Sequence, residues 1–153
     1  MHIRRGVPAL AALVLVVAGM PHVPAGTATV APYTIITIRT TGYNLAFDPD
    51  RITVREGDTV RIRYVNESTL GHNLVLVRNE DDIDLLGAAA YDAARTGFVP
   101  MEHKDRMIAW TAMASPGQTV EVEFVAPPAG SYPFVCLVDG HFNVMVGTLV
   151  SRR

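Results

Sequence analysis

The chain has 153 residues, a formal charge of −2 at pH 7 and a hydrophobic fraction of 49%. Its 13 basic side chains form no cluster, which argues against a nucleic acid partner because such proteins present dense Lys and Arg patches. It has a single cysteine, so the chain cannot form an internal disulfide.

The N-terminus is predicted to be a secretory signal peptide. Arg4 and Arg5 precede an uncharged, mostly apolar run over 7–20, and small residues and prolines follow. This order is typical of secretory leaders. Cleavage after Ala25 and cleavage after Ala28 both fit the preference for small residues. The run is shorter than the roughly 20 residues of a membrane span, and retention as a membrane anchor is the alternative interpretation.

Residues 29–153, after a leader of residues 1–28, are predicted to form one all-β domain. Without the two leader arginines, 11 basic side chains remain against 15 acidic ones, a formal charge of −4. Short alternating or β-branched segments are separated by turn signals, over 33–40, 51–54, 59–66, 72–77, 107–112, 119–125, 131–136 and 146–151. The pattern predicts a β-sandwich or barrel of seven to eight strands.

One segment, from Asp81 to Gly97, departs from the β pattern. It has acidic residues at its start, Arg95 near its end and a glycine as a stop signal, which are typical of a helix. We expect one helix of three to four turns, weakened by Gly87, before the fifth or sixth strand. The acidic cluster is interpreted as a helix start rather than a cation site.

The cysteine, Cys136, ends an apolar strand and is followed by His141 and Met145. Asp139 and Gly140 lie between them and form a tight-turn signal. A loop of this length can turn the three side chains toward one point. An unpaired cysteine in an exported chain suggests a metal ligand or a reactive thiol, and the alternative is a buried, inert cysteine.

A fourth ligand is expected, because three ligands leave a soft metal underbound. His2 and His22 lie in or beside the leader, which leaves His72 and His103. His72 begins a buried strand, where it can project from the end of the sheet toward the same loop. His103 lies in a charged segment and is interpreted as a solvated residue.

Copper is the metal that this set of side chains favours. Zinc rarely accepts a thioether, whereas two imidazoles, a thiolate and a weak axial thioether form the blue-copper electron-transfer arrangement. A rigid site whose ligand geometry is intermediate between those that Cu(I) and Cu(II) prefer limits how far the ligands move as an electron passes. A metal-bound thiolate is also occupied, which explains an unpaired cysteine in an exported chain.

At these residues the sequence resembles the cupredoxins, and among them the azurin and auracyanin branch. The resemblance is carried by the C-x4-H-x3-M spacing, "GHNLVL", "RMIAWTAMASPGQTVEVEF" and "YPFVC…GHFNVMVGTL". It extends over most of the chain from about Tyr33. It implies a cupredoxin-like Greek-key β-sandwich with one inserted helix and one type 1 copper ion.

Residue by residue, the resemblance implies His72, Cys136 and His141 as equatorial copper ligands. Met145 would be the weak axial ligand, and the Gly71 carbonyl a weak contact on the opposite side.

The same resemblance implies that Asn73 joins the two ligand loops. Backbone N–H groups of Asn73 and Val138 would donate to the thiolate sulfur and tune the potential. Leu137 stands where the family commonly has a hydroxyl residue, so the Asn73 side chain is expected to lack its usual partner.

A docking surface around the second histidine is also implied, formed by Val138, Asp139, Gly140, Phe142 and Val144. Azurins have proline where this chain has Asp139. We expect this charge to favour a basic partner surface and to lower the potential modestly. The alternative is an exposed turn residue with no such role.

The sequence thus predicts an exported carrier that shuttles single electrons between larger redox proteins, such as c-type cytochromes or a terminal reductase or oxidase. The protein is expected in the periplasm or another extracytoplasmic compartment and is not expected to be an enzyme, because three histidines beyond the leader are too few for a multinuclear copper centre. The alternative is a copper-handling protein, a chaperone or scavenger, that uses the same ligands. A metal-free binding module is disfavoured because all four ligands are present.

Overall fold

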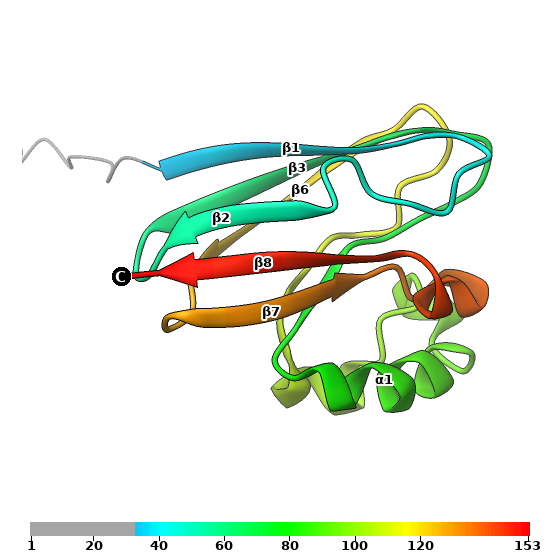
Figure 1. The fold of residues 1–153 in the computed structure, drawn as a ribbon. Coiled ribbons are helices and arrows are strands. Elements are labelled where there is room, and N and C mark those ends of the chain that lie inside the picture. Colours follow the sequence, from blue (N-terminus) through cyan, green and yellow to red (C-terminus); the bar gives the residue numbers. More distant parts are fainter. Residues whose placement is uncertain (1–32) are drawn as a thin grey trace, which may run out of the picture. The chain divides into compact units, whose positions relative to one another are not determined.

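Two β-sheets pack face to face in the computed structural model, which describes residues 33–153 (Figure 1). The predicted signal peptide lies outside the described residues. The smaller sheet has the order β1-β3-β6, and the larger has the order β2-β8-β7-β4-β5. Eight strands therefore form a sandwich over the described residues, and the predicted all-β fold with one inserted helix is confirmed.

The smaller sheet consists of β1 (Tyr33–Gly42), β3 (Thr59–Ser68) and β6 (Thr119–Val125). Strand β1 runs parallel to β3, and β6 runs antiparallel to it. The larger sheet consists of β2 (Arg51–Arg55), β4 (Val75–Val77), β5 (Met107–Trp110), β7 (Gly130–Val135) and β8 (Val146–Arg152). Strands β2 and β8 are parallel, whereas β8, β7, β4 and β5 pair antiparallel.

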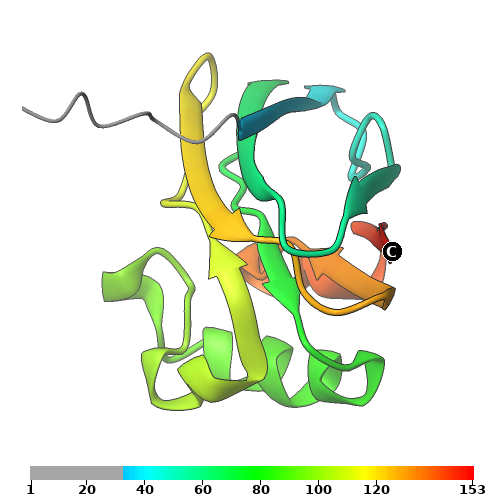
Figure 2. The same cartoon turned by 90° about the vertical axis from the view of Figure 1, so that its left-hand side faces the viewer.

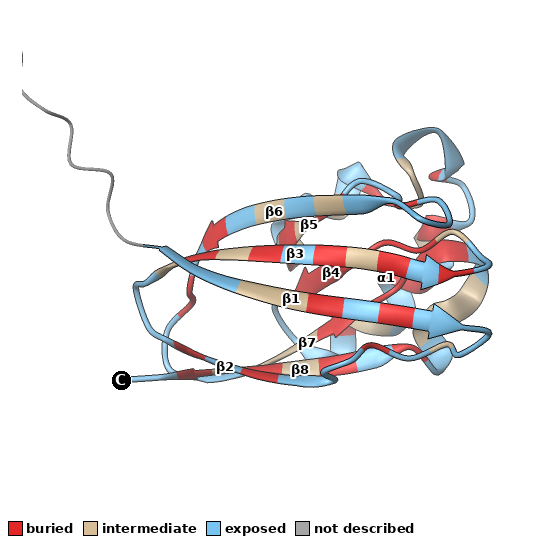
Figure 3. Ribbon diagram, turned by 90° about the horizontal axis from the view of Figure 1, so that it is seen from above, coloured by how far each residue is buried: buried red, intermediate tan, exposed pale blue. Residues whose placement is uncertain are grey.

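Strand β3 shows why alternating polarity produces this sandwich. Val60, Ile62 and Tyr64 are fully buried between the sheets, whereas Arg61 and Arg63 point to the opposite face, because successive side chains of a strand alternate in direction. Figure 3 shows the resulting alternation of buried and exposed positions along the strands.

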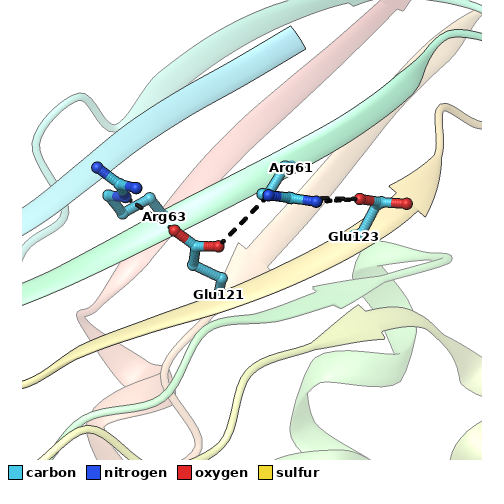
Figure 4. A network of polar contacts seen from close by, with 4 residues as sticks. All are labelled: Arg61, Arg63, Glu121 and Glu123. Atoms are coloured by element: carbon cyan, nitrogen blue, oxygen red, sulfur yellow. Dashed lines mark hydrogen bonds and ion pairs between the residues drawn. The ribbon is translucent and has the colours of Figure 1, made fainter. Parts of the chain in front are cut away.

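The outer face of the smaller sheet is solvated and carries opposite charges across neighbouring strands. Arg61 lies 2.9 Å from Glu123, and Arg63 lies 2.8 Å from Glu121 (Figure 4). Each pair is directly opposite in the β3–β6 register. Exposed ion pairs add little stability, but they keep this face in water and fix which side of the strands turns inward.

Strand β4 is buried on both faces, as its continuous apolar sequence predicts. Leu76 packs between the sheets, while Val75 and Val77 pack on the outer side of the larger sheet, in a cluster with Leu86 of the helix. The strand is shorter than predicted, because only Val75–Val77 joins the ladder and His72 makes an isolated bridge to Ala114.

The helical segment is also shorter than predicted. A 3-10 turn (η1, Glu80–Asp82) leads into α1 (Ile83–Ala90), and a second 3-10 turn (η2, Ala94–Thr96) follows. The Ala93 carbonyl accepts the Thr96 hydroxyl at 2.9 Å and the Phe98 N–H at 2.9 Å. Such local side-chain bonds favour turns over helix. The prediction of a single helix of three to four turns is therefore wrong.

Helix α1 covers the outer side of the larger sheet, beside β4 and β7 (Figures 1 and 2). Two further 3-10 segments, η3 (Met101–Arg106) and η4 (Val138–Asn143), lie before β5 and β8. Figure 1 shows η4 at the end of the sandwich away from the start of β1. In residues 33–153, no helix is long and apolar enough to cross a membrane.

Candidate metal centre

Side chains from two distant parts of the chain meet at η4: His72 from one, and Cys136 and His141 from the other. The Cys136 Sγ atom lies 3.6 Å from His72 Nδ1 and 3.5 Å from His141 Nδ1. One donor atom from each residue falls within 4.8 Å of the others. The structure therefore brings together three of the four ligands expected from sequence.

His72 is held by backbone hydrogen bonds. Its N–H donates to the Ala114 carbonyl at 3.1 Å, and the Ala114 N–H donates back at 2.7 Å. The Asn66 side chain donates to that same carbonyl at 2.8 Å. The ring is fully buried, and its Nε2 atom has no hydrogen-bond partner among residues 33–153, so only the Nδ1 side is directed at other polar atoms.

Cys136 continues the alternation of β7. Phe134, Cys136 and Val138 face the core between the sheets, while Val135 and Leu137 face the cluster beneath α1. An apolar residue after the cysteine is thus suited to its position, because that side chain is covered by the helix.

Met145 is buried in the same core cluster as Cys136. Its N–H donates to the His141 carbonyl at 2.7 Å, and its carbonyl accepts the Cys136 N–H at 3.1 Å. The β7–β8 pairing therefore places the expected axial residue beside the cysteine.

Two consecutive residues of the loop that links Cys136 to Met145 adopt left-handed backbone angles. Asp139 has φ 44° and Gly140 has φ 79°. Asp tolerates this region better than most residues do, whereas proline is restricted to φ near −65°. A proline at position 139 would therefore change the loop backbone as well as remove a charge.

The site favours neutral groups when it holds no cation. Burial raises the pKa of the Cys136 thiol to about 11, against the effect of hydrogen bonds from the Asn73 and Val138 backbone N–H groups. Burial lowers the pKa of His72 to about 4 and also lowers that of His141. Neutral imidazoles are the form that binds metals, and a bound cation replaces the thiol proton.

The Asn73 side chain joins three segments. Its Oδ1 atom accepts the Leu137 N–H at 2.8 Å, and its Nδ2 group donates to the Gly97 carbonyl at 2.8 Å. The hydroxyl partner common in the family is missing, because residue 137 is leucine, but the side chain has two backbone partners instead. The backbone after η2 supplies the acceptor, which sequence reasoning missed because the loop after the helix had no assigned role.

The residues expected at the docking surface differ in exposure. Val144 is 63% exposed and Asp139 is also exposed, while Gly140 and Phe142 are half-buried and Val138 is buried. Apolar contact at this rim therefore rests chiefly on Val144.

Two exposed apolar side chains beside Gly71 were missed from sequence. Leu70 is 47% exposed and Met113 is 39% exposed, and a Cβ atom added to Gly71 would lie 3.4 Å from the Met113 sulfur. For Leu70 the available signal was its position two residues before His72, whereas no histidine adjoins Met113 in the sequence. His103 is half-buried in η3 and does not join the cluster.

The acidic cluster at the start of the helical segment has a structural partner. Asp82 is buried, accepts a hydrogen bond from Asn79 at 3.0 Å and pairs with Arg106 just before β5. This agrees with its interpretation as a helix start.

The donor set fits type 1 copper. Two imidazole nitrogens and a sulfur converge in a buried site. Two backbone N–H groups donate hydrogen bonds to that sulfur. The buried Met145 thioether belongs to the residue whose carbonyl accepts the Cys136 N–H. Two His, one Cys and a weak axial Met distinguish this class from zinc sites.

Comparison with known sequences places the chain in a family. The family described as "Copper binding proteins, plastocyanin/azurin family" matches residues 35–151. The chain belongs to this family of blue copper electron-transfer proteins, and it holds one type 1 copper ion.

Individual relatives agree with this assignment. Auracyanin-A of Chloroflexus aurantiacus is 40% identical over 120 residues, which are 75% of this chain and 72% of that protein. The solved structure of auracyanin A, described as a "blue" copper protein, matches with a TM-score of 0.75 at 37% identity. The match covers 79% of this chain and 100% of that one. A copper-resistant cuproprotein, CopI of Rubrivivax gelatinosus, is 33% identical over 71% of this chain and 61% of its own length.

Proposed function

We propose that His72, Cys136 and His141 hold the copper ion, with Met145 as the weak axial ligand and the Gly71 carbonyl as a distant contact. The observation that carries this assignment is the convergence of three donor atoms within 4.8 Å in a buried site. The copper ion, when bound, takes up and releases one electron. The chain excludes water from it, since three of the four ligand side chains are fully buried.

Electrons are exchanged through His141. It is half-buried, whereas the other three ligand side chains have no exposed surface. A partner that docks over this histidine shortens the distance to the copper without opening the site. The protein therefore acts as a carrier and does not transform a substrate.

The partner surface surrounds His141 and includes the exposed residues Asp139 and Val144. An apolar rim with one carboxylate suits a partner that presents apolar contacts and a basic side chain, because complementary charge speeds encounter and sets orientation. Proteins such as c-type cytochromes or a terminal reductase or oxidase are partners of this kind.

We place the protein in the periplasm or another extracytoplasmic compartment. The basic, apolar and small segments within residues 1–28 support export. A leader that is kept would instead tether the domain to the membrane.

The ligand assignment is tested by the visible and EPR spectra of the purified protein with one equivalent of Cu(II). We expect an intense thiolate-to-copper band and a narrow copper hyperfine splitting. Both should be absent from Cys136→Ala, which removes only the sulfur ligand. A pale spectrum from the parent chain would overturn the assignment.

The role of Asp139 is tested by Asp139→Asn rather than by proline, since Asn also tolerates a φ of 44°. We expect a modestly higher reduction potential and a weaker salt dependence of electron transfer to a basic cytochrome. An unchanged potential together with an unchanged salt dependence would show that this carboxylate has no part in docking.

Copper handling is the second candidate function, favoured by the similarity to a copper-resistant cuproprotein. A handling protein must exchange its ion, whereas the ligands here are buried. We expect loss of copper to a strong chelator to be slow and one-electron cycling to be reversible. Rapid copper release with poor cycling would favour the handling function instead.

A further inference from the structure

Helix α1 and the ligand loop (138–144) fit together through an aromatic ring placed on a glycine. A Cβ atom added to Gly87 would lie 2.5 Å from Cδ1 of Phe142, far inside normal contact distance. The Phe142 ring therefore lies directly against the helix backbone. Glycine is a poor residue for the interior of a helix, so the space it leaves for this ring explains its presence better than the helix does.

A second contact of the same kind runs in the opposite direction. Tyr91, the residue that caps the end of α1, places its hydroxyl 2.6 Å from a Cβ atom added to Gly140. Gly140 has φ 79° as well, a backbone angle that disfavours a larger residue. The helix thus receives a ring from the loop and presents its own tyrosine to the loop.

The two contacts bracket His141 in the sequence. Gly140 and Phe142 are its immediate neighbours, and both are held against α1. In the described part of the chain, the side-chain hydrogen bonds of the ligand loop stay within residues 136–145, as in the bond from Asn143 to the Gly140 carbonyl. Beyond these bonds, the loop is attached to the rest of the domain by Val138 in the core between the sheets and by Phe142 against α1.

We propose that Gly87 and Tyr91 are positioning residues for the copper site, and that α1 acts through them as a clamp on His141. The inference rests on the proposed role of His141 as a ligand. A clamped histidine keeps its Nδ1 atom directed at Cys136 in the metal-free protein and in both oxidation states, which limits ligand movement during electron transfer.

The decisive variant is Gly87→Ala in the full chain. The added methyl group displaces Phe142, so we expect a broader copper hyperfine splitting, faster copper loss to a chelator and an electron self-exchange rate reduced about tenfold, since misplacement of a reacting group by ~1 Å can cost up to 100-fold. Tyr91→Ala, which removes the other contact, should shift the same three readouts in the same direction.

Two controls separate clamping from general damage to the helix. Ala88→Gly lies on the exposed face of α1 and weakens the helix without touching the loop, so it should lower the melting temperature but leave the spectra unchanged. In the double variant Gly87→Ala/Phe142→Ala the clash is gone, so it should match Phe142→Ala alone.

A copper-independent readout separates this inference from the ligand assignment. In copper-free protein, NMR should show Gly87 protons shifted by the Phe142 ring current, and the shift should vanish in Phe142→Ala. A parent chain without the blue band would overturn the ligand assignment even if this contact is present. Gly87→Ala with unchanged spectra and copper loss, or a double variant that differs from Phe142→Ala alone, would overturn the clamp.

Discussion

The two histidines of the site present the same atom to Cys136 at nearly the same distance, 3.6 Å for His72 and 3.5 Å for His141, yet they are held in different ways. His72 is fully buried and fixed by backbone hydrogen bonds to Ala114. His141 is half-buried; its backbone hydrogen bonds stay within residues 136–145, and the loop packs against α1 through Phe142.

The difference follows from what each side of the site must do. The inner histidine needs no access to solvent, so directional hydrogen bonds within the sheet can fix it. In the proposed route, the outer histidine meets a partner, which excludes covering it with a strand. Packing from behind, by a helix on the outer side of the larger sheet, leaves its outer edge open.

The largest expected loss of stability comes from the apolar cluster beneath α1, which supports the His141 loop. Leu137→Ala removes a fully buried side chain beneath α1 and should destabilise the copper-free protein by about 3 to 4 kcal/mol, as for other buried Leu to Ala changes. Urea unfolding measures this. NMR signals of the His141 imidazole should move more than those of His72.

Leu85→Ala is the matched control, because Leu85 lies on α1 itself but is 38% exposed. It should cost less than about 1 kcal/mol. Equal costs for the two variants would mean that the cluster beneath α1 does not hold the loop.

The hydrogen bonds that hold the His72 segment are tested by Asn66→Ala. Asn66 is fully buried, and its amide group donates to the Leu70 carbonyl at 2.7 Å and the Ala114 carbonyl at 2.8 Å. Each unsatisfied buried group costs about 1–3 kcal/mol, so we expect a loss of about 3 kcal/mol in urea unfolding. His72 signals should now move more than those of His141.

The exposed Asn44 provides the control, since Asn44→Ala should stay within about 0.5 kcal/mol of the parent. If Asn66→Ala moved His141 and spared His72, the division between the two sides would be wrong.

A smaller, pH-dependent effect is expected where the helical segment begins. Hydrogen bonds from Asn79 and Arg106 lower the pKa of Asp82 below its ordinary value of 3.8. The stabilisation is therefore present above that value and is lost as the pH falls through the lower folded-state pKa. Asp82→Asn should reduce stability near neutral pH and match the parent in strong acid.

Urea unfolding across this pH range, with Asp81→Asn as the exposed neighbour control, measures the Asp82 effect. A stability difference that stayed constant into strong acid would show that the charge of Asp82 is not its source.

The smallest effect is expected on the outer face of the smaller sheet, which contributes no residue to the copper site. Glu123→Gln removes the exposed pair with Arg61 and should change stability only slightly, with the change disappearing in concentrated salt, which screens exposed charges. Neither imidazole signal should shift. A shift of the His72 signals would connect this face to the copper site after all.

Much of the site could be predicted because its chemistry is local in the sequence. The spacing of Cys136, His141 and Met145 spans one loop between two paired strands, and the apolar run after His72 required a strand buried on both faces. Ligand type then favoured copper, since few metals accept a thiolate and a thioether together.

What the sequence determined by itself was the alternation that makes a sandwich and the set of candidate copper donors, because both depend on residue type and short spacing. The tertiary structure alone decided that Asn73 bonds to Gly97, that Phe142 turns inward onto Gly87 and that Asp139 is left-handed. These outcomes depend on which surfaces meet across the fold. Helix α1 and the ligand loop are separated by about fifty residues that belong to both sheets, so no local pattern records the contact.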